Sequence, residues 1–82
     1  MRLTKGSMMI NNDARRERGD NIVGILLYRK GCKWYFSLTS PHNETGEIVT
    51  TIQWATRESI VRGIASGNVQ YIPASIRRKR SV

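Results

Sequence analysis

The sequence has one cysteine, Cys32, and one histidine, His42, in 82 residues. A single cysteine excludes an internal disulfide, and one Cys with one His cannot supply the four ligands of a structural zinc site. No stretch approaches the roughly 20 apolar residues that a membrane helix needs, and the polar segment 1–6 has no apolar core of the kind that marks a signal peptide. We therefore expect a cytoplasmic protein that does not bind membranes, and the unpaired thiol fits a reducing compartment.

Groups that could carry out catalysis are equally scarce. His42 has only Glu44 nearby as a carboxylate partner, in a segment rich in turn-forming residues. Cys32 lies between Gly31 and Lys33, and no second cysteine is present to resolve an oxidised form. The sequence also lacks a glycine-rich phosphate loop, a helix-turn-helix spacing and a zinc-finger pattern. We therefore expect no enzymatic activity, no cofactor, no metal and no small-molecule substrate.

Positive charge is abundant and unevenly placed. The formal net charge is +8, and half of it lies in a C-terminal run without a compensating acid. That run consists of Arg77, Arg78, Lys79 and Arg80. A basic segment of this kind attracts nucleic acid, acidic proteins and anionic surfaces alike.

The chain divides into an arm, a folded part and a tail. Residues 1–20 have few large apolar residues and no sustained periodicity, which predicts a disordered N-terminal arm. Within it, Gly6-Ser7-Met8 is typical of a cloning remnant, unless the natural start is Met8 or Met9. We predict that the folded domain spans residues 21–72 and that residues 73–82 form a basic tail.

Hydrophobic periodicity predicts three strands and one helix. Trp34, Phe36 and Leu38 alternate with other residues, and this period of two places them on one face of a strand. Thr56 and Gly67 are typical residues at the start and end of a helix, and apolar residues between them recur at helical spacing. The predicted strands are Ile22–Tyr28, Lys33–Thr39 and Glu47–Gln53, and the first two form a hairpin across Lys30-Gly31-Cys32. The helix follows Thr56, and Val69–Ile72 is an optional fourth strand.

These elements predict an α+β fold, a three-stranded antiparallel sheet followed by one helix (βββα), because the connections between the strands are short. A chain of this length encloses only a marginal core, so we expect a homodimer. Gly63 costs about 1 kcal/mol relative to alanine inside a helix, and close packing of another backbone or of a ring, from Trp34 or Trp54, would explain it. The residues predicted to form the core or the dimer interface are Trp34, Phe36, Leu38, Trp54, Ile60, Gly63 and Ile64.

Four short motifs span most of the predicted domain. They are Lys33-Trp34-Tyr35-Phe36-Ser37-Leu38, Gly46-Glu47-Ile48-Val49-Thr50-Thr51, Trp54-Ala55-Thr56 and Arg62-Gly63-Ile64-Ala65-Ser66. Together they resemble the YegP-like family of small bacterial and archaeal proteins of unknown function. The resemblance covers residues 24–68 and implies a three-stranded sheet with one helix, and single-copy members are expected to pair as homodimers. The long loop 40–46, a short third strand, Gly67 in place of an apolar residue and the basic tail depart from the family pattern, and the family provides no catalytic residues.

Charge without catalytic groups predicts a small binding module that contacts nucleic acid or another polyanion. Tyr35 is a candidate for base stacking because it lies on the face opposite Trp34 and beside Lys33. The predicted contact residues are Arg29, Lys30, Lys33, Tyr35, Arg77, Arg78, Lys79 and Arg80. The other expected class of partner is an acidic host protein. The alternative function is a phage- or mobile-element-type protein–protein inhibitor or accessory factor.

Overall fold

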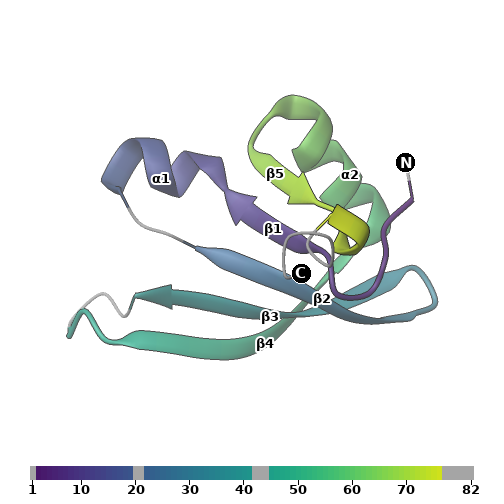
Figure 1. Ribbon diagram of the computed structural model, residues 1–82, viewed down its shortest axis with the longest axis horizontal. Helices are drawn as coiled ribbons and strands as arrows, with labels where there is room; N and C mark the ends of the chain where they lie inside the picture. Colours follow the sequence, from purple (N-terminus) through teal and green to yellow (C-terminus); the bar gives the residue numbers. More distant parts are fainter. Residues whose placement is uncertain (1, 20–21, 42–44, 77–82) are drawn as a thin grey trace.

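Five antiparallel strands form one sheet in the order β4-β3-β2-β1-β5 (Figure 1). The computed structural model describes residues 2–19, 22–41 and 45–76. The elements are β1 (Met8–Asn11), α1 (Asn12–Arg18), β2 (Val23–Lys30), β3 (Lys33–Pro41), β4 (Ile48–Thr56), α2 (Arg57–Ser66) and β5 (Val69–Ile72). Residues 74–76 add a short helical turn after the last strand.

The α+β class is confirmed, but the predicted βββα fold, which the family resemblance also implied, is wrong. The sheet has five strands, and residues 8–18 of the predicted disordered arm form β1 and α1. β1 lies between β2 and β5, with Met9 opposite Gly24 on one side and opposite Tyr71 on the other. A strand of four residues carries too little local periodicity to be predicted, because its stability comes from pairing with distant parts of the chain.

The segment before β1 is also built into the fold. Leu3 lies in the buried core. The Gly6 N–H donates to the Leu26 carbonyl over 2.7 Å, and the Leu26 N–H donates to the Ser7 carbonyl over 3.0 Å. The segment Gly6-Ser7-Met8, which sequence reasoning assigned to a cloning remnant, therefore continues the pairing of the N-terminal chain with β2.

Ser7 is fully buried and joins three parts of the chain. Its Oγ accepts hydrogen bonds from the Tyr71 hydroxyl (2.9 Å) and from the Ala74 N–H (3.1 Å). The Thr4 Oγ1 lies 2.7 Å from the same atom. Burial raises the pKa of Tyr71, whereas its hydrogen bonds with Ser7 and Thr4 lower it, and the net shift is downward. The network ties the N-terminal segment to β5 and to the turn that follows it.

We expect Ser7→Ala to lower the free energy of unfolding by about 1–3 kcal/mol, because the change leaves buried donors without their acceptor. Urea denaturation followed by tryptophan fluorescence measures the loss. Ser75→Ala makes the same change at an exposed position of the nearby turn, and it is expected to stay within about 0.5 kcal/mol of the unsubstituted protein. Equal stabilities of the two variants would contradict the structural role of Ser7.

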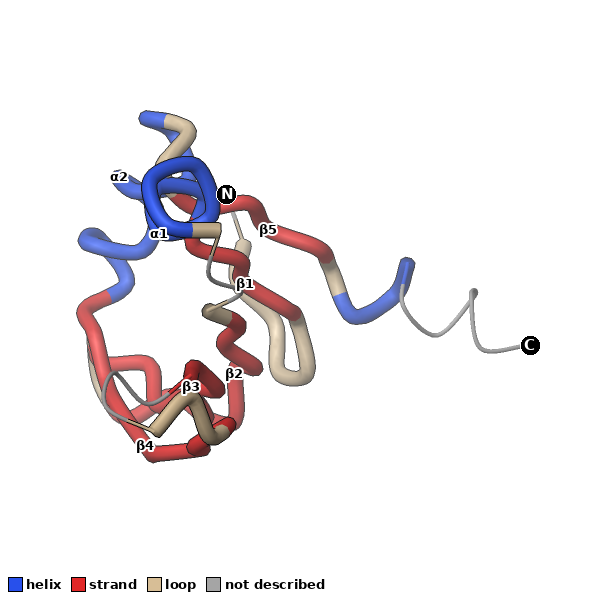
Figure 2. The backbone as a smooth tube through the Cα atoms, turned by 90° about the vertical axis from the view of Figure 1, so that its left-hand side faces the viewer, coloured by secondary structure: helices blue, strands red, loops and turns tan. Residues whose placement is uncertain are grey.

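The sheet is curved, and α2 packs on its inner face (Figure 2). Strand alternation divides the side chains between an inner and an outer face. The inner face is the one that holds Trp34, and the register places Ala55 beside it. The buried apolar core consists of Leu3, Met9, Leu26, Trp34 and Ile60, and the half-buried residues packed against it are Phe36, Ala55, Val61, Ile64, Val69 and Tyr71.

The core does not close completely. An open apolar cavity of about 360 Å³ lies between α2 and the inner face of the sheet. The predicted core residues Phe36, Leu38 and Ile60 line part of it, and its polar lining residues are Asn11 and Ser59. This incomplete packing agrees with the expectation that so short a chain forms a marginal core.

The ends of α2 follow the sequence prediction. The Thr56 Oγ1 accepts from the Ser59 N–H over 3.2 Å at the start of the helix, and Gly67 ends it with φ 85°. A Cβ placed on Gly63 would approach the Val69 side chain at 3.1 Å, and both nearest heavy atoms belong to that valine. Close packing against the Val69 side chain of β5 therefore explains the glycine. The prediction that a tryptophan ring packs there is wrong.

Trp54, which we predicted for the core or the dimer interface, does not lie in the core of the subunit. The third predicted strand ended at Gln53, whereas β4 continues to Thr56. Trp54 therefore shares the alternation of Ile52 and lies on the outer face, where it is 52% exposed.

Candidate functional site

A tight hairpin between β2 and β3 shapes one end of the molecule. Its two-residue turn places Gly31 at φ 63°, a conformation that this kind of turn requires at its first position. Lys30 and Lys33 are cross-strand partners at the base of the turn. Both lysines are exposed, and like charges directly opposite each other in a sheet repel. An anion bound between them would relieve this repulsion.

A β-bulge in β2 distributes the hairpin residues between the two faces. The register shifts between Leu26 and Tyr28, so that Tyr28 pairs with Tyr35 and Arg29 pairs with Trp34. Tyr28 therefore lies on the outer face and Arg29 on the inner face. Uninterrupted alternation from Leu26 would have placed Tyr28 on the inner face and Arg29 on the outer face.

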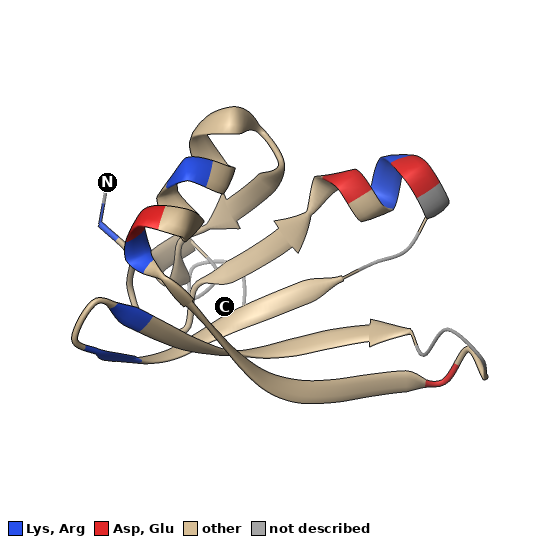
Figure 3. Cartoon of the chain, turned by 180° about the vertical axis from the view of Figure 1, so that it is seen from behind, with Lys and Arg blue, Asp and Glu red and all other residues tan. Residues whose placement is uncertain are grey.

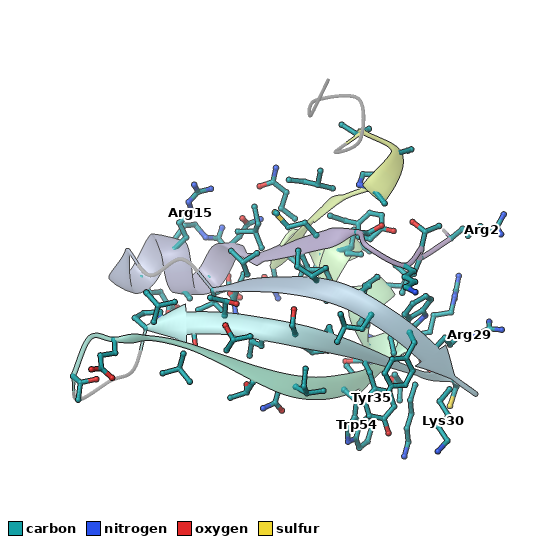
Figure 4. The ribbon with its side chains drawn as sticks, turned by 60° about the horizontal axis from the view of Figure 1, so that its bottom comes forward. Arg2, Arg15, Arg29, Lys30, Tyr35 and Trp54 are labelled. Carbon is teal, nitrogen blue, oxygen red and sulfur yellow. The ribbon has the colours of Figure 1, made fainter. Side chains whose placement is uncertain are left out.

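Three aromatic residues form a row across β2, β3 and β4 on the outer face, which we call the aromatic row: Tyr28, Tyr35 and Trp54. The rings of Tyr28 and Tyr35 are stacked, with centroids 4.8 Å apart and planes at 12°. Tyr35 is the cross-strand partner of Trp54. The Lys33 Nζ lies 4.3 Å from the centroid of the Trp54 ring, which is a cation–π contact. Figure 4 shows Tyr35 and Trp54 near Lys30 at this end of the sheet.

A second group of cations lies on the other side of the hairpin. Arg2, Arg29 and Arg57 line a cleft of about 390 Å³ together with Leu3 and Trp34, and we call it the arginine cleft. Arg57 is the first residue of α2, so the helix dipole adds positive potential at the same place. The cleft has no acidic residue among its described lining residues. Its chemistry favours an anion such as a phosphate group.

Charge is therefore polarised along the molecule (Figure 3). Basic residues gather at the hairpin, the N-terminal segment and the start of α2, which lie at one end. The acidic residue before β4 lies toward the other end, as does α1, which carries both acids and arginines, whereas Glu58 at the start of α2 lies at the basic end. Two acids have basic partners on their own helices, Asp13 with Arg16 and Glu58 with Arg62. The hairpin end is the part of the described surface on which an anionic ligand would meet the strongest positive potential.

Four of the predicted contact residues come together at this end. Lys30, Lys33 and Tyr35 share the outer face, whereas Arg29 lies in the arginine cleft on the inner side. The predicted contacts Arg77, Arg78, Lys79 and Arg80 lie outside the described residues. Sequence reasoning did not include Trp54, Arg2 or Arg57 among the contact residues. Continuing the alternation of Ile48, Thr50 and Ile52 by one step places Trp54 on their face, but the apolar character of that face predicts burial, and only the structure shows that it is exposed.

The other groups considered at the sequence level contribute no reactive centre. Cys32 is an exposed free cysteine in the hairpin turn, and His42 lies outside the described residues. Within ranges 2–19, 22–41 and 45–76, no three His, Cys, Asp or Glu side chains are close enough to hold a metal ion. Over the same part of the chain, no helix combines the length and apolar character needed to span a membrane.

The chain matches no protein-family model, no curated protein and no solved structure. The surface itself shows what this end of the molecule can do chemically. It offers aromatic rings for stacking and fixed positive charge for anions, side by side.

Proposed function

We propose that the protein binds single-stranded nucleic acid at the hairpin end. The observation that carries this proposal is the aromatic row, exposed on the same face as Lys30 and Lys33. Proteins that bind single strands without sequence preference combine rings on which bases stack with cations that follow the phosphates. Both components occur within one hairpin and its neighbouring strand.

Stacking would use the two ends of the aromatic row. Tyr28 and Tyr35 cover one face of each other's rings, and Lys33 covers part of Trp54. Tyr28 is 50% exposed and Trp54 is 52% exposed, so a base can stack on either without displacing a core side chain. Since every base has a π-face, these contacts provide affinity with little sequence preference.

Phosphate contacts would come from both sides of the hairpin. Lys30 and Lys33 accompany the bases on the outer face, and the arginine cleft accepts phosphates on the inner side. A strand that crosses the hairpin would thus neutralise several cations and release condensed counterions, which makes binding strongly dependent on salt. The basic run 77–80 would add to the same attraction through its charge alone.

We expect Trp54→Ala to weaken binding of a short single-stranded oligonucleotide about 5- to 150-fold, since stacking of one base contributes about 1–3 kcal/mol. Fluorescence anisotropy of a labelled oligonucleotide at low salt measures the dissociation constant. Ile76→Ala is the control, because Ile76 is an exposed apolar residue in the turn after β5, at the opposite edge of the sheet from β4. Its affinity is expected to remain that of the unsubstituted protein.

The same titrations separate this proposal from its rivals. Indifference to every oligonucleotide at low salt would remove the proposal. Equal affinity for a single strand, a duplex and an acidic polypeptide, unaffected by Trp54→Ala, would indicate a partner bound by charge alone. The expected outcome is tighter binding to the single strand than to the duplex. The affinity for the single strand is expected to fall as salt rises from about 50 to 200 mM.

A further inference from the structure

The two edges of the sheet are protected to different degrees. β5 is four residues long and is followed directly by Pro73, two features with which natural sheets block further pairing. β4 is nine residues long, contains no charged residue and is rich in Thr, Ile and Val. Ile48 is 70% exposed and Ile52 is 60% exposed. β4 thus has the composition of a strand that pairs on both sides, and within the described part of the chain it has one neighbour, β3.

The hydrogen-bonding groups on the open side of β4 can be assigned from the hairpin. Lys30 and Lys33 flank a two-residue turn and therefore form a hydrogen-bonded pair, so the even-numbered residues of β3 direct their N–H and C=O groups toward β4. The Arg57 N–H donates to the Cys32 carbonyl over 2.8 Å. This bond joins an even-numbered residue before β3 to an odd-numbered residue after β4, as the assignment requires. The odd-numbered residues of β4 consequently bond to β3, and the even-numbered residues direct their groups outward: Ile48, Thr50, Ile52 and Trp54.

We propose that two copies of this chain pair through β4, antiparallel and about a two-fold axis at Ile52, to form one continuous sheet. The N–H and C=O groups that point outward from one β4 must face those that point outward from the other. This register satisfies that requirement and pairs the two strands over their full length. Ile52 lies opposite Ile52 of the partner subunit, and Thr50 lies opposite Trp54 of the partner subunit. A two-fold axis makes the interface self-complementary, as it is in most homodimers.

The charges at the two ends of β4 favour a second copy in this orientation. The exposed Glu47 precedes β4 and the exposed Arg57 follows it. Neither residue belongs to the strand, but the antiparallel order brings the Glu47 end of one β4 to the Arg57 end of the partner subunit's β4, so an acid lies near a base at each end of the interface. A parallel arrangement would instead bring two cationic hairpins together. The antiparallel one separates the two Thr56 positions by eight residues, roughly 27 Å along the strand, well beyond the Debye length of about 8 Å at physiological salt.

The proposed dimer also places two aromatic rows on one surface. The two Trp54 side chains lie on the outer face of the joined sheet, about 14 Å apart along the strand direction because four residues separate them. The pairing itself depends on the edge of β4 and not on any ligand, so it can be tested whether or not nucleic acid binds.

Light scattering of the full chain is expected to show twice the mass of 9.4 kDa. Ile52→Pro removes an outward N–H and leaves the bonds of β4 to β3 in place, a position at which an edge strand tolerates proline. We expect this variant to be a folded monomer by light scattering and circular dichroism. Ile52→Thr, which keeps the N–H and a β-branched side chain, is the control and is expected to remain dimeric.

Cross-linking tests the register without relying on a proline. In a Cys32→Ser background, Ile52→Cys places two thiols in directly opposed positions, with a Cα separation of about 5.5 Å that a short bifunctional maleimide can bridge. Ile48→Cys is equally accessible, but its two copies lie about 27 Å apart along the strand. We expect a cross-linked dimer from the first variant only. A monomeric parent chain, a dimeric Ile52→Pro variant, or preferential cross-linking through Ile48→Cys would each overturn the proposal.

Discussion

A chain that begins at Asn12 is expected to be unfolded, although the sequence predicts that the missing residues 1–11 belong to a disordered arm. β1 is the strand that connects β5 to the rest of the sheet. Its deletion removes Leu3 and Met9 from the buried core and takes Ser7 away from Tyr71. Each buried apolar side chain contributes about 2–5 kcal/mol, and a domain of this kind has only about 5–15 kcal/mol in total. These losses are comparable with the whole stability, and the lost pairing of β1 with both β2 and β5 adds to them.

Circular dichroism and thermal denaturation measure this effect. The truncated chain is expected to show neither a cooperative transition nor a near-ultraviolet signal from Trp34. A chain that begins at Leu3 is the control, since it keeps every core residue and is expected to melt close to the full chain. A cooperative transition in the Asn12 chain at a similar temperature would show that β1 is dispensable.

The sequence was most informative where structure is set by local signals. The alternation around Trp34 and Phe36 predicted β3, and the capping residues Thr56 and Gly67 marked the ends of α2. The Gly31 turn predicted the hairpin. In each case the determining interactions lie within a few residues, so the residue types themselves report the conformation.

Non-local pairing and strand bulges account for what the sequence did not reveal. β1 is held by partners 17 or 64 residues away, as in the pairs Met8 with Ile25 and Met8 with Ile72. The bulge between Leu26 and Tyr28 changes which face Arg29 occupies, and no local pattern announces a bulge of this kind. Three predicted contact residues therefore share one face, whereas the fourth lies in a cleft with two arginines from elsewhere in the chain.

In the proposed binding site, the bulge determines which residues belong to the aromatic row. Without it, Tyr28 and Arg29 would exchange faces, the aromatic row would end at Tyr35, and the outer face would lose its stacked pair. The irregularity in β2 thus separates stacking groups from the guanidinium cleft while keeping both at one end of the sheet. Bulges commonly re-aim side chains next to functional sites.

Leu26 links the bulged strand to the core, and we expect Leu26→Ala to lower the free energy of unfolding by about 2–5 kcal/mol. Its side chain is 0% exposed, and its backbone is bonded to the N-terminal segment at Gly6 and Ser7. The substitution removes buried apolar volume at the point where β2 meets that segment. Since the side chain is fully buried, its removal loses all of its apolar contacts at once, and the cost falls toward the upper part of the range.

Leu27→Ala provides the matched control, because it makes the same chemical change one residue along the strand, within the bulge, at a partly exposed position. Urea denaturation of both variants is expected to show the Leu26 variant less stable by more than about 1 kcal/mol, with an unchanged dependence on urea concentration. A Leu27 variant as unstable as the Leu26 variant would mean that the bulge itself, and not burial beneath the N-terminal segment, stabilises this part of β2. Because the bulge also positions Tyr28, oligonucleotide binding would then weaken in the Leu27 variant, which distinguishes the two explanations in the same samples.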